Sequence, residues 1–564
     1  MKNNFFERRK HSTLLLFLFF FSYFILMFGN GIISLTHPDE VFYTQSAKEM
    51  LERHSWFTPY IFDEIQFEKP FLAFALFVMG IKWFGLTPFV ARFWPAFFGI
   101  IGVGITYWIA WMLFKSKRLA FFAGVILCTS FIYLSLARAV LTDMIFTVII
   151  AASIGFFVFG YWYPQYKNRG IILWLCFSAF AVLTKGLLGV CFPVSIALFY
   201  LFYNKDLKFL LCKATVCGLF FFIGITLPWH MVMYQNHGQF FLDEYFKNVH
   251  FRRLFEAEHL RLNRWYFYPA VMFFGFMPWF LFWIPAIKMI VRNLKYNFPE
   301  RKNIALLLFW IIGTYIFVQP AASKLASYIF PAFPAVAMIL AFYVHQAVMN
   351  VERGKNAIGL RWCGYGMVIF LAFIVISAVS ACSILSHFIP DRMPIYLCAA
   401  LLAFFAVLIF IFNVKKQYVR MVLSHAGMTI SVLILLYTAK PYIEPWVSCK
   451  MISLKFNAMD QSDTPVLASK FYVRGVKFYT GRDMVVMDIN GKGFFSPHPI
   501  PFFKTDWEVL QFLKQRPRTY AIVKEGDVLD LQRILRGQAF SMRQMETIGG
   551  KYIIKIDKIE KNIL

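Results

Sequence analysis

Two neighbouring acids, Asp39 and Glu40, stand just beyond the first long apolar segment of the chain, and a third, Asp143, begins a later one. The chain is 59% hydrophobic and only 15% charged. An acid at the end of an apolar segment must therefore be hydrated, paired with a cation or functional. A carboxylate there can take a proton from an attacking group or stabilise a developing positive charge. These three acids are therefore the first candidates for catalysis.

Each acid also has a simpler structural interpretation, because Asp39 can cap a surface helix beside it and Asp143 can cap the segment that it begins. Taken alone, either acid fits capping as well as catalysis. Cations at the same level of the chain favour catalysis, because guanidinium and ammonium groups bind a phosphate or pyrophosphate through charge-assisted hydrogen bonds. These cations are Lys69, Arg138, Lys185, Arg253 and Lys324.

The elements that must position these residues are membrane spans. The mean hydropathy is +0.60, and apolar runs of about 20 residues recur, each long enough to cross the hydrocarbon core of a bilayer. The net charge of +27 comes from short clusters of Lys and Arg between these runs, which indicates membrane topology and argues against nucleic-acid binding. The nine cysteines lie mostly inside apolar runs without metal spacing, so we expect small core residues.

We predict an α-helical polytopic membrane protein with about 13 transmembrane helices over residues 1–439, beginning with a retained signal anchor. The predicted spans are 14–33, 89–114, 119–136, 141–160, 171–184, 186–203, 209–229, 268–291, 304–319, 325–348, 361–388, 393–413 and 421–439. The short apolar segment 71–86 decides the sidedness. If this segment does not cross the membrane, every basic loop falls on the cytoplasmic side. If it does cross, most of the basic loops fall on the outside. We therefore predict a cytoplasmic N-terminus and an external C-terminus.

This topology places loop 34–92 on the outside, together with the candidate acids and cations. The composition shifts near residue 440, and residues 440–564 are predicted to form a small soluble α/β domain on the outer face. Its expected strands are 466–469, 484–488 and 551–556, and its expected helices are 507–513 and 528–535. The chemistry is therefore expected at the external rim.

Several short motifs occur in a fixed order over about the first 340 residues. They are Asp39-Glu40 with Tyr43, Phe67-Glu68-Lys69-Pro70, Ala137-Arg138 with Thr142-Asp143-Met144, Leu183-Thr184-Lys185-Gly186, His250 with Arg253, and Ser323-Lys324 with Ser327-Tyr328. Together they resemble the bacterial membrane glycosyltransferases related to the protein mannosyltransferases. The resemblance is closest to the 4-amino-4-deoxy-L-arabinose lipid A transferases. Phe42 stands where that family has an arginine.

The resemblance implies an inverting GT-C transferase with an undecaprenyl phosphate-linked sugar as donor and lipid A or another membrane acceptor. It places the site at the periplasmic face of the bacterial inner membrane. It implies catalytic roles for Asp39 and Asp143, with Glu40 in support. The residues implied in binding the donor phosphate are Lys69, Arg253, Lys185, Lys324, Tyr328 and Tyr43. Glu68 and His250 match a possible divalent metal site, and no other cofactor is implied.

The role of Asp39 then depends on the acceptor. With a hydroxyl acceptor, Asp39 can act as general base. With a lipid A phosphate, which is already anionic, Asp39 would orient the acceptor or stabilise a cationic aminosugar such as 4-amino-4-deoxy-L-arabinose.

Two other functions fit part of the pattern. A second kind of transferase would move another polyprenyl-phosphate sugar to protein or glycan, and it would share the same core motifs. A transporter also carries intramembrane charges, but usually near the bilayer midplane and in repeated halves. Here the charges gather at one rim and no repeat is visible, so the sequence favours a transferase.

Overall fold

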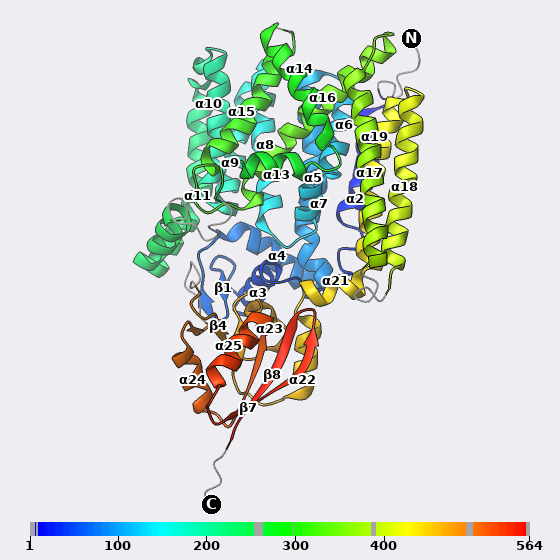
Figure 1. The fold of residues 1–564 in the computed structure, drawn as a ribbon. Coiled ribbons are helices and arrows are strands. Elements are labelled where there is room, and N and C mark those ends of the chain that lie inside the picture. The colour runs from blue at the N-terminus through cyan, green and yellow to red at the C-terminus, as the bar shows by residue number, and fades with distance from the viewer. Residues whose placement is uncertain are drawn as a thin grey trace, which may run out of the picture. The chain divides into compact units, whose positions relative to one another are not determined.

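The computed structural model describes residue 6 and residues 9–252, 263–296, 298–384, 391–491 and 500–559, with only the backbone of 249–251. The chain divides into two compact units. The helical unit comprises Met1–Asn30, Lys69–Ala73 and Arg92–Thr438, and the mixed unit comprises Gly31–Glu68, Phe74–Ala91 and Ala439–Leu564. Figure 1 traces the chain through the helices of the first unit and the six-stranded sheet of the second.

Nine helices within the described residues are long and apolar enough to cross a membrane. They are Pro88–Phe114 (α5), Thr142–Trp162 (α8), Pro164–Lys185 (η1 and α9), Lys213–Asn248 (α11 into η3), Arg301–Val318 (α15), Ala326–Glu352 (η6 and α16), Ile358–Cys382 (in α17), Met393–Val414 (α18) and Tyr418–Thr438 (α19 and α20). The shorter apolar helices are His11–Leu26 (α2), Phe71–Phe84 (α4) and Leu188–Tyr203 (α10). The predicted helical polytopic membrane fold is confirmed, while the count of about 13 spans and their sidedness stay predictions.

Two expected spans are bent. Lys117–Cys128 (α6) and Phe131–Ala137 (α7) meet at 65°, and Phe267–Gly275 (α13) and Phe280–Lys295 (η5 and α14) meet at 114°. At the second bend Pro278 has no N–H group to continue a helix. With each bent pair counted as one span, up to eleven spans lie in the described residues.

Two neighbouring helices of the helical unit bring separate motifs together. α8 and α9 (Lys167–Lys185) are joined by the short turn η1 (Pro164–Tyr166), so they run antiparallel and the start of α8 lies level with the end of α9. Gly160 and Gly170 permit a close approach, because a Cβ atom at Gly170 would lie 2.4 Å from the Gly160 Cα. The first turn of α8 therefore faces the last turn of α9.

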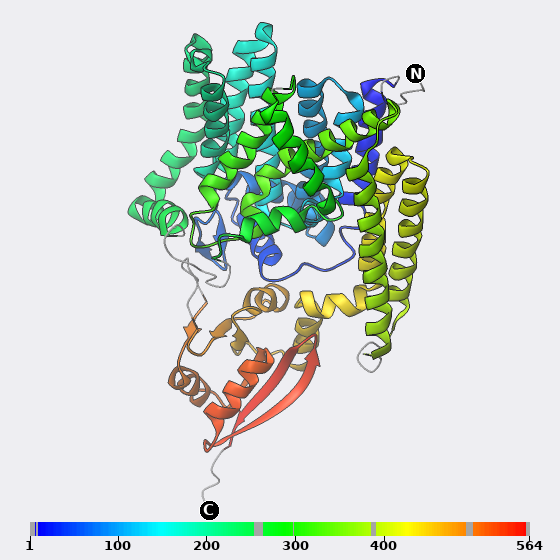
Figure 2. The same cartoon turned by 45° about the horizontal axis from the view of Figure 1, so that its top comes forward.

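The mixed unit contains a sheet with strand order β5-β4-β3-β6-β8-β7. The strands are β3 (Val466–Ser469), β4 (Met484–Met487), β5 (Phe502–Phe503), β6 (Arg518–Val523), β7 (Phe540–Ile548) and β8 (Lys551–Lys558). Strands β3 to β6 pair in parallel, and β8 pairs antiparallel with β6 and β7. The long pair β7 and β8 is visible in red in Figure 2.

Buried apolar residues explain why the middle of this sheet forms. Every residue of β3 and β4 is buried, as expected for parallel strands covered on both faces. The helices beside the strands are α21 (Lys440–Val447), α22 (Lys450–Met459), α23 (Val473–Thr480), α24 (Asp506–Lys514) and α25 (Glu525–Leu535). The strands and helices predicted after residue 440 are all confirmed, within a few residues at their ends.

The mixed unit also contains most of the loop between the first two long apolar segments. This part forms α3 (Asp39–Glu52), the hairpin strands β1 (Tyr60–Ile61) and β2 (Glu64–Ile65), and most of α4. The segment that carries Asp39 therefore folds with the C-terminal residues in one unit, although the two are more than 400 positions apart in the chain.

Candidate active site

The predicted site residues are distributed over both units. Asp39, Glu40, Tyr43 and Glu68 belong to the mixed unit, and Lys69, Asp143, Lys185, Lys324 and Tyr328 belong to the helical unit. Arg253 lies outside the described residues, and His250 lies in η3 (Leu242–Arg252) with its side chain undescribed. Each group is therefore described within its own unit.

Asp39 is the first residue of α3, and its side chain is exposed. The N-cap position is Pro38, which has no side-chain acceptor, so Asp39 does not hold the N-cap position that the structural interpretation gave it. The helix macrodipole favours a negative charge in this first turn. Asp39 is thus an exposed carboxylate at a fixed helix start.

Glu40 has a different environment from its neighbour. It is 4% exposed, and its Oε2 atom accepts hydrogen bonds from the backbone N–H and the hydroxyl of Thr36, both at 2.8 Å. These bonds close the turn that leads into α3. Glu40 therefore stabilises the start of α3, and its supporting role in catalysis stays a prediction.

The backbone before Asp39 is held by the C-terminal residues. The Ser34 N–H donates to the Glu444 carboxylate at 2.9 Å. The Leu35 carbonyl accepts from the Ser448 hydroxyl at 2.9 Å and the Tyr479 hydroxyl at 3.1 Å. Burial opposes ionisation of Glu444, but the bonds from Ser34 and the charges of Lys440 and Lys450 together outweigh it and keep the Glu444 pKa below its usual value. The C-terminal residues therefore anchor the segment that carries Asp39, and the sequence alone offered no signal for this role.

His37 provides a second anchor point in the same segment. Its backbone N–H donates to the Val447 carbonyl at 3.2 Å, and its ring packs edge-on against Tyr472 with centroids 5.2 Å apart. Its Nδ1 atom lies 3.5 Å from the Cys449 sulfur. Burial, with a smaller contribution from the charge of Lys551, lowers the pKa of His37 to about 4.

This depressed pKa predicts acid sensitivity of the mixed unit. An unfolded histidine has a pKa of 6.5, so His37 contributes full stability above that pH and loses it as pH falls towards 4. We expect the free energy of unfolding to drop by about 2 kcal/mol between pH 7 and pH 5, at about 1.4 kcal/mol per unit. Thermal unfolding of the detergent-solubilised protein measures this drop, which His37→Phe should remove.

His54 supplies a matched control for this prediction, because it is exposed and lies at the end of α3 in the same unit. His54→Asn should keep the acid sensitivity of the unmodified protein. An unchanged pH profile in His37→Phe would show that other groups cause the acid sensitivity.

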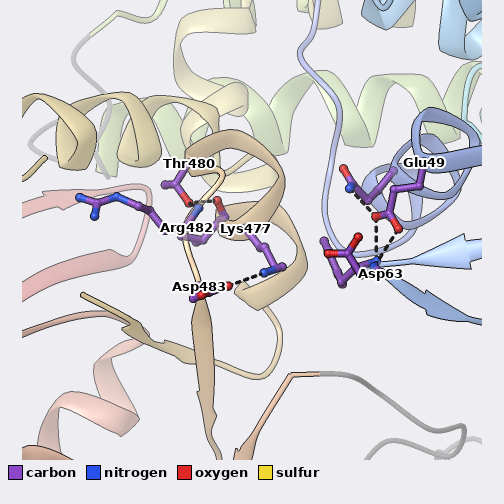
Figure 3. Close-up of polar contacts among 9 residues, drawn as sticks. Glu49, Asp63, Lys477, Thr480, Arg482 and Asp483 are labelled. Carbon is purple, nitrogen blue, oxygen red and sulfur yellow. Dashed lines mark hydrogen bonds and ion pairs between the residues drawn. The ribbon is translucent and has the colours of Figure 1, made fainter. Parts of the chain in front are cut away.

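The other end of α3 is fixed by a carboxylate (Figure 3). Glu49 accepts hydrogen bonds from the backbone N–H groups of Phe62 at 2.7 Å and Asp63 at 2.9 Å, at the tip of the β1–β2 hairpin. The Lys477 ammonium lies 5.5 Å from the Phe62 ring centroid and pairs with Asp483 at 3.3 Å. Helix α3 is therefore held at both ends within the mixed unit.

Tyr43 lies one turn along α3, where its ring is part of an aromatic core. The ring centroid lies 5.7 Å from that of Phe74 and 6.4 Å from that of Phe77, and the residue is 8% exposed. Its predicted contact with a donor phosphate stays a prediction. The packing contacts show that the Tyr43 ring stabilises α3 against α4.

In the helical unit, Asp143 and Lys185 form a buried ion pair between the start of α8 and the end of α9. Their side chains are 8% and 7% exposed. The Lys185 ammonium also lies 5.1 Å from the Tyr328 ring centroid and 5.6 Å from the Phe146 ring centroid. Asp143 is therefore the partner of a cation, and Leu141 rather than Asp143 holds the N-cap position of α8.

Lys324 is a second buried cation of the helical unit, at 1% exposure. Its ammonium donates to the carbonyls of Gln319 and Ala321, which follow the end of α15, and lies 5.8 Å from the Tyr268 ring centroid. Lys69, also in this unit, is 9% exposed. A lysine ammonium has three donors, so the two carbonyl bonds of Lys324 leave one donor of that residue for another acceptor.

Arg138 has a structural role that the sequence did not reveal. Its guanidinium donates to the carbonyls of Ile25 and Phe28, each at 2.9 Å, and to the Tyr437 hydroxyl at 2.7 Å. These carbonyls stand at the end of α2, where a helix lacks donors of its own. Arg138 therefore caps α2 and joins it to α20 (Thr429–Thr438).

The predicted metal site is only partly covered by the structure. Glu68 is half-buried in the mixed unit, and the His250 side chain is undescribed. Within the described ranges, no group of three or more His, Cys, Asp or Glu gathers as a metal site requires. The metal site stays a prediction.

Comparisons with known proteins show what the chain is similar to in sequence and in fold. Residues 12–242 match the family model described as dolichyl-phosphate-mannose-protein mannosyltransferase. An uncharacterised protein of Aquifex aeolicus (strain VF5) is 28% identical over 376 residues, which cover 66% of this chain and 70% of that protein. The undecaprenyl phosphate-alpha-4-amino-4-deoxy-L-arabinose arabinosyl transferase of Yersinia pestis (strain Pestoides F) is 26% identical over 350 residues, 61% of each chain. The protein of the same name from Photorhabdus laumondii is 25% identical over 56% of each chain, so the matches span less than two thirds of these transferases.

The fold match extends over almost the whole chain. Crystal structures of ArnT from Cupriavidus metallidurans superpose with TM-scores of 0.73 when bound to undecaprenyl phosphate and 0.74 in the apo state. Each covers 97% of this chain at 18% sequence identity, which is evidence about the fold. The family match over residues 12–242, the relatives and the fold agree: the chain has the helices of an integral membrane protein, shares its fold with ArnT, and is similar to the membrane glycosyltransferases related to the protein mannosyltransferases.

Proposed function

We propose that the protein transfers an aminosugar, such as 4-amino-4-deoxy-L-arabinose, from an undecaprenyl phosphate donor to lipid A. The observation that carries this proposal is Asp39, an exposed carboxylate at the start of α3 whose preceding backbone is anchored by Glu444, Ser448 and Tyr479. An acid held in this way can orient an acceptor or stabilise a cationic sugar. The names of the arabinosyl transferase relatives and of the ArnT structure support the donor and the sugar.

The proposed reaction needs fixed positive charge where the donor phosphate leaves. An oxygen of the acceptor attacks the anomeric carbon, the bond from that carbon to the phosphate oxygen breaks, and undecaprenyl phosphate departs with inverted sugar configuration. Lys69, Lys185, Lys324 and Arg253 are the cations proposed to stabilise the developing charge. With a lipid A phosphate as acceptor no proton must be removed, and Asp39 then acts on orientation and on the aminosugar charge.

The proposed location is the periplasmic face of the bacterial inner membrane. The basic loops support this location, because positive residues of short loops stay cytoplasmic. If segment 71–86 does not cross the membrane, all the clusters of Lys and Arg between the apolar runs fall on one side. The N-terminus is then cytoplasmic, and the C-terminal domain is periplasmic.

A second acceptor class deserves a direct comparison, because the matched family model names a protein mannosyltransferase. Mass spectrometry of lipid A from cells with and without the gene separates the two. We expect the aminosugar-modified lipid A to disappear with the gene, and to return with the unmodified gene but not with Asp39→Asn. Unchanged lipid A together with lost glycosylation of protein or glycan would overturn the lipid A assignment in favour of the second acceptor.

A further inference from the structure

We propose that the helical unit binds phosphatidylglycerol, an anionic glycerophospholipid, in a cavity between three of its helices. The cavity has a volume of about 950 Å³, near the upper end of the range for ligand sites. Its walls are α14 (Trp283–Lys295), α16 (Phe333–Glu352) and α17 (Ile358–Ile384), with the segments next to them. None of the candidate site residues that the structure describes lines this cavity, so the proposal goes beyond sugar transfer.

The lining of the cavity changes from apolar to polar along α14 and α16. These two helices run in the same direction, because one span, α15 (Arg301–Val318), separates them in the chain. The lining positions that come first are apolar, at 281–285 and 342–343. Those that come later are mostly polar, at 288–293 and 346–350. The cavity therefore has an apolar end and a polar end, as a phospholipid has.

Gly359 fixes the level of α17, which follows α16 after a short loop and runs in the opposite direction. A Cβ atom at Gly359 would lie 2.7 Å from the Tyr343 hydroxyl oxygen and 3.0 Å from the Pro285 Cβ atom, so the three helices approach closely there. Asn356 precedes this level and lies at the polar end, whereas Trp362 follows it and lies at the apolar end. Trp362 is 70% exposed. The apolar end therefore opens to the surrounding lipid, where acyl chains can enter.

Two cations line the polar end. Lys288 and Arg292 are four positions apart in α14, so they share one face of the helix. The Arg292 guanidinium carbon lies 5.6 Å from the Phe298 ring centroid, and neither cation forms an ion pair with a described residue. Glu300 is the one acid among the described lining residues, so two cations less one acid give a net charge of +1. This charge balances the single negative charge of a phosphodiester, and basic pockets between membrane helices bind anionic lipid headgroups.

Asn293 adds a buried acceptor to the polar end. The residue is 7% exposed, its Nδ2 atom donates to the Met289 carbonyl at 3.3 Å, and its Oδ1 atom accepts no hydrogen bond from the described residues. A buried acceptor without a donor is costly, and a glycerol hydroxyl of phosphatidylglycerol would satisfy it. Phosphatidylcholine has the same phosphate without such hydroxyls. Phosphatidylethanolamine carries no net charge and would leave the charge of the lining unbalanced.

The alternative is a general attraction between the basic loops and any anionic surface, which needs no cavity. The double variant Lys288→Gln with Arg292→Gln separates the two, because it removes both cations of the cavity wall. The matched control is Lys295→Gln with Lys302→Gln, which removes two nearby cations that do not line the cavity. All four side chains are exposed, so both double variants should fold.

The experiment uses the full chain in detergent and measures the Kd of each lipid by titration and native mass spectrometry. The unmodified protein should bind phosphatidylglycerol at least about tenfold more tightly than phosphatidylcholine with the same acyl chains. The cavity double variant should bind phosphatidylglycerol about 10- to 30-fold more weakly, because each cation near a lipid phosphate contributes about fivefold. The control double variant should stay within about threefold of the unmodified protein, since exposed charges outside the site are screened.

Asn293→Leu tests the headgroup contact, because leucine has a similar size and no acceptor. We expect about fivefold weaker binding of phosphatidylglycerol, which corresponds to the loss of one hydrogen bond. Phosphatidic acid has the phosphate and the acyl chains without the headgroup glycerol, so it should bind the variant and the unmodified protein equally. An equal loss for phosphatidic acid would overturn the headgroup contact. Thermal unfolding verifies the fold of each variant.

Equal losses in the two double variants would overturn the proposal in favour of a general attraction. Phosphatidylethanolamine that binds as tightly as phosphatidylglycerol, or undecaprenyl phosphate that displaces it at equal concentration, would overturn the choice of lipid. If the cavity double variant does not fold, each single substitution provides the same test with an effect of about fivefold. Lipid binding needs no turnover, so a wrong sugar or acceptor in the proposed function would leave these outcomes unchanged.

Discussion

Asp39→Asn is expected to reduce sugar transfer by about 10²- to 10⁴-fold, the range typical of a positioned acid or base. Asparagine has nearly the same shape as aspartate but lacks the negative charge, so it can neither accept a proton nor stabilise an aminosugar cation. The exposed side chain contributes little packing, and the anchors on Ser34 and Leu35 do not involve it. The variant should therefore fold normally.

Turnover of a purified donor and acceptor measures this effect, and thermal unfolding verifies the fold. Glu40→Gln is the matched control, because it weakens the buried acceptor of two Thr36 bonds beside the proposed site. We expect Glu40→Gln to lower the free energy of unfolding by about 1 kcal/mol and to retain most of the transfer. Near-normal transfer in Asp39→Asn, or a larger loss in Glu40→Gln, would reverse the roles given to the two acids.

The pH dependence of the residual rate separates two functions of Asp39. If Asp39 takes a proton from a hydroxyl acceptor, the unmodified enzyme should lose activity at low pH along a limb that Asp39→Asn lacks. If the acceptor is a phosphate, no such limb arises from proton removal, and the variant should lose affinity for the aminosugar. Comparing an aminosugar donor with one that carries a hydroxyl at the same position would reveal that loss.

The sequence predicted those parts of the fold that depend on local composition. Apolar runs of membrane length predicted the helices, and short apolar runs predicted strands β3, β4 and β8. It also placed Asp143 and Lys185 at one membrane level, because they lie at the facing ends of consecutive spans. Hydrophobic length and order along the chain are enough for these predictions.

The sequence could not predict which of the candidate cations donate to backbone carbonyls at helix ends. Arg138 and Lys324 were grouped with the phosphate-binding candidates, but Arg138 caps the end of α2 and Lys324 donates to two carbonyls after α15. A helix end leaves carbonyls without intrahelical donors, and which side chain reaches them depends on tertiary packing. Residue type alone does not distinguish a capping cation from one that binds a ligand.

The link between the first loop and the C-terminal domain was equally hidden. Ser34 and Glu444 are 410 positions apart, and the contact between Phe42 and Arg474 spans a similar separation. Periodicity reports which residues share a face within one element, but it carries no information about which distant element covers that face. The C-terminal domain, for which the sequence indicated no function, is the part that anchors the segment carrying Asp39.

Breaking the Asp143–Lys185 pair is expected to have the largest effect on stability. Both side chains are more than nine-tenths buried, so removing one partner leaves a charge without compensation. Such losses cost about 3–5 kcal/mol, and we expect this range for Lys185→Met and for Asp143→Leu. The matched control is Asp243→Asn, which breaks the exposed pair of Asp243 with Lys247 and should cost less than about 1 kcal/mol.

The double variant Asp143→Leu with Lys185→Met separates stability from function. With both charges removed, no buried charge lacks a partner, so the double variant should recover most of the stability that each single variant loses. Transfer should stay low, because the Lys185 ammonium over the Tyr328 ring is one of the cations proposed to bind the donor phosphate. Unfolding in detergent and turnover of the same preparations test both parts. A double variant that transfers sugar normally would mean that the pair only joins α8 to α9, and the phosphate would then depend on the other cations.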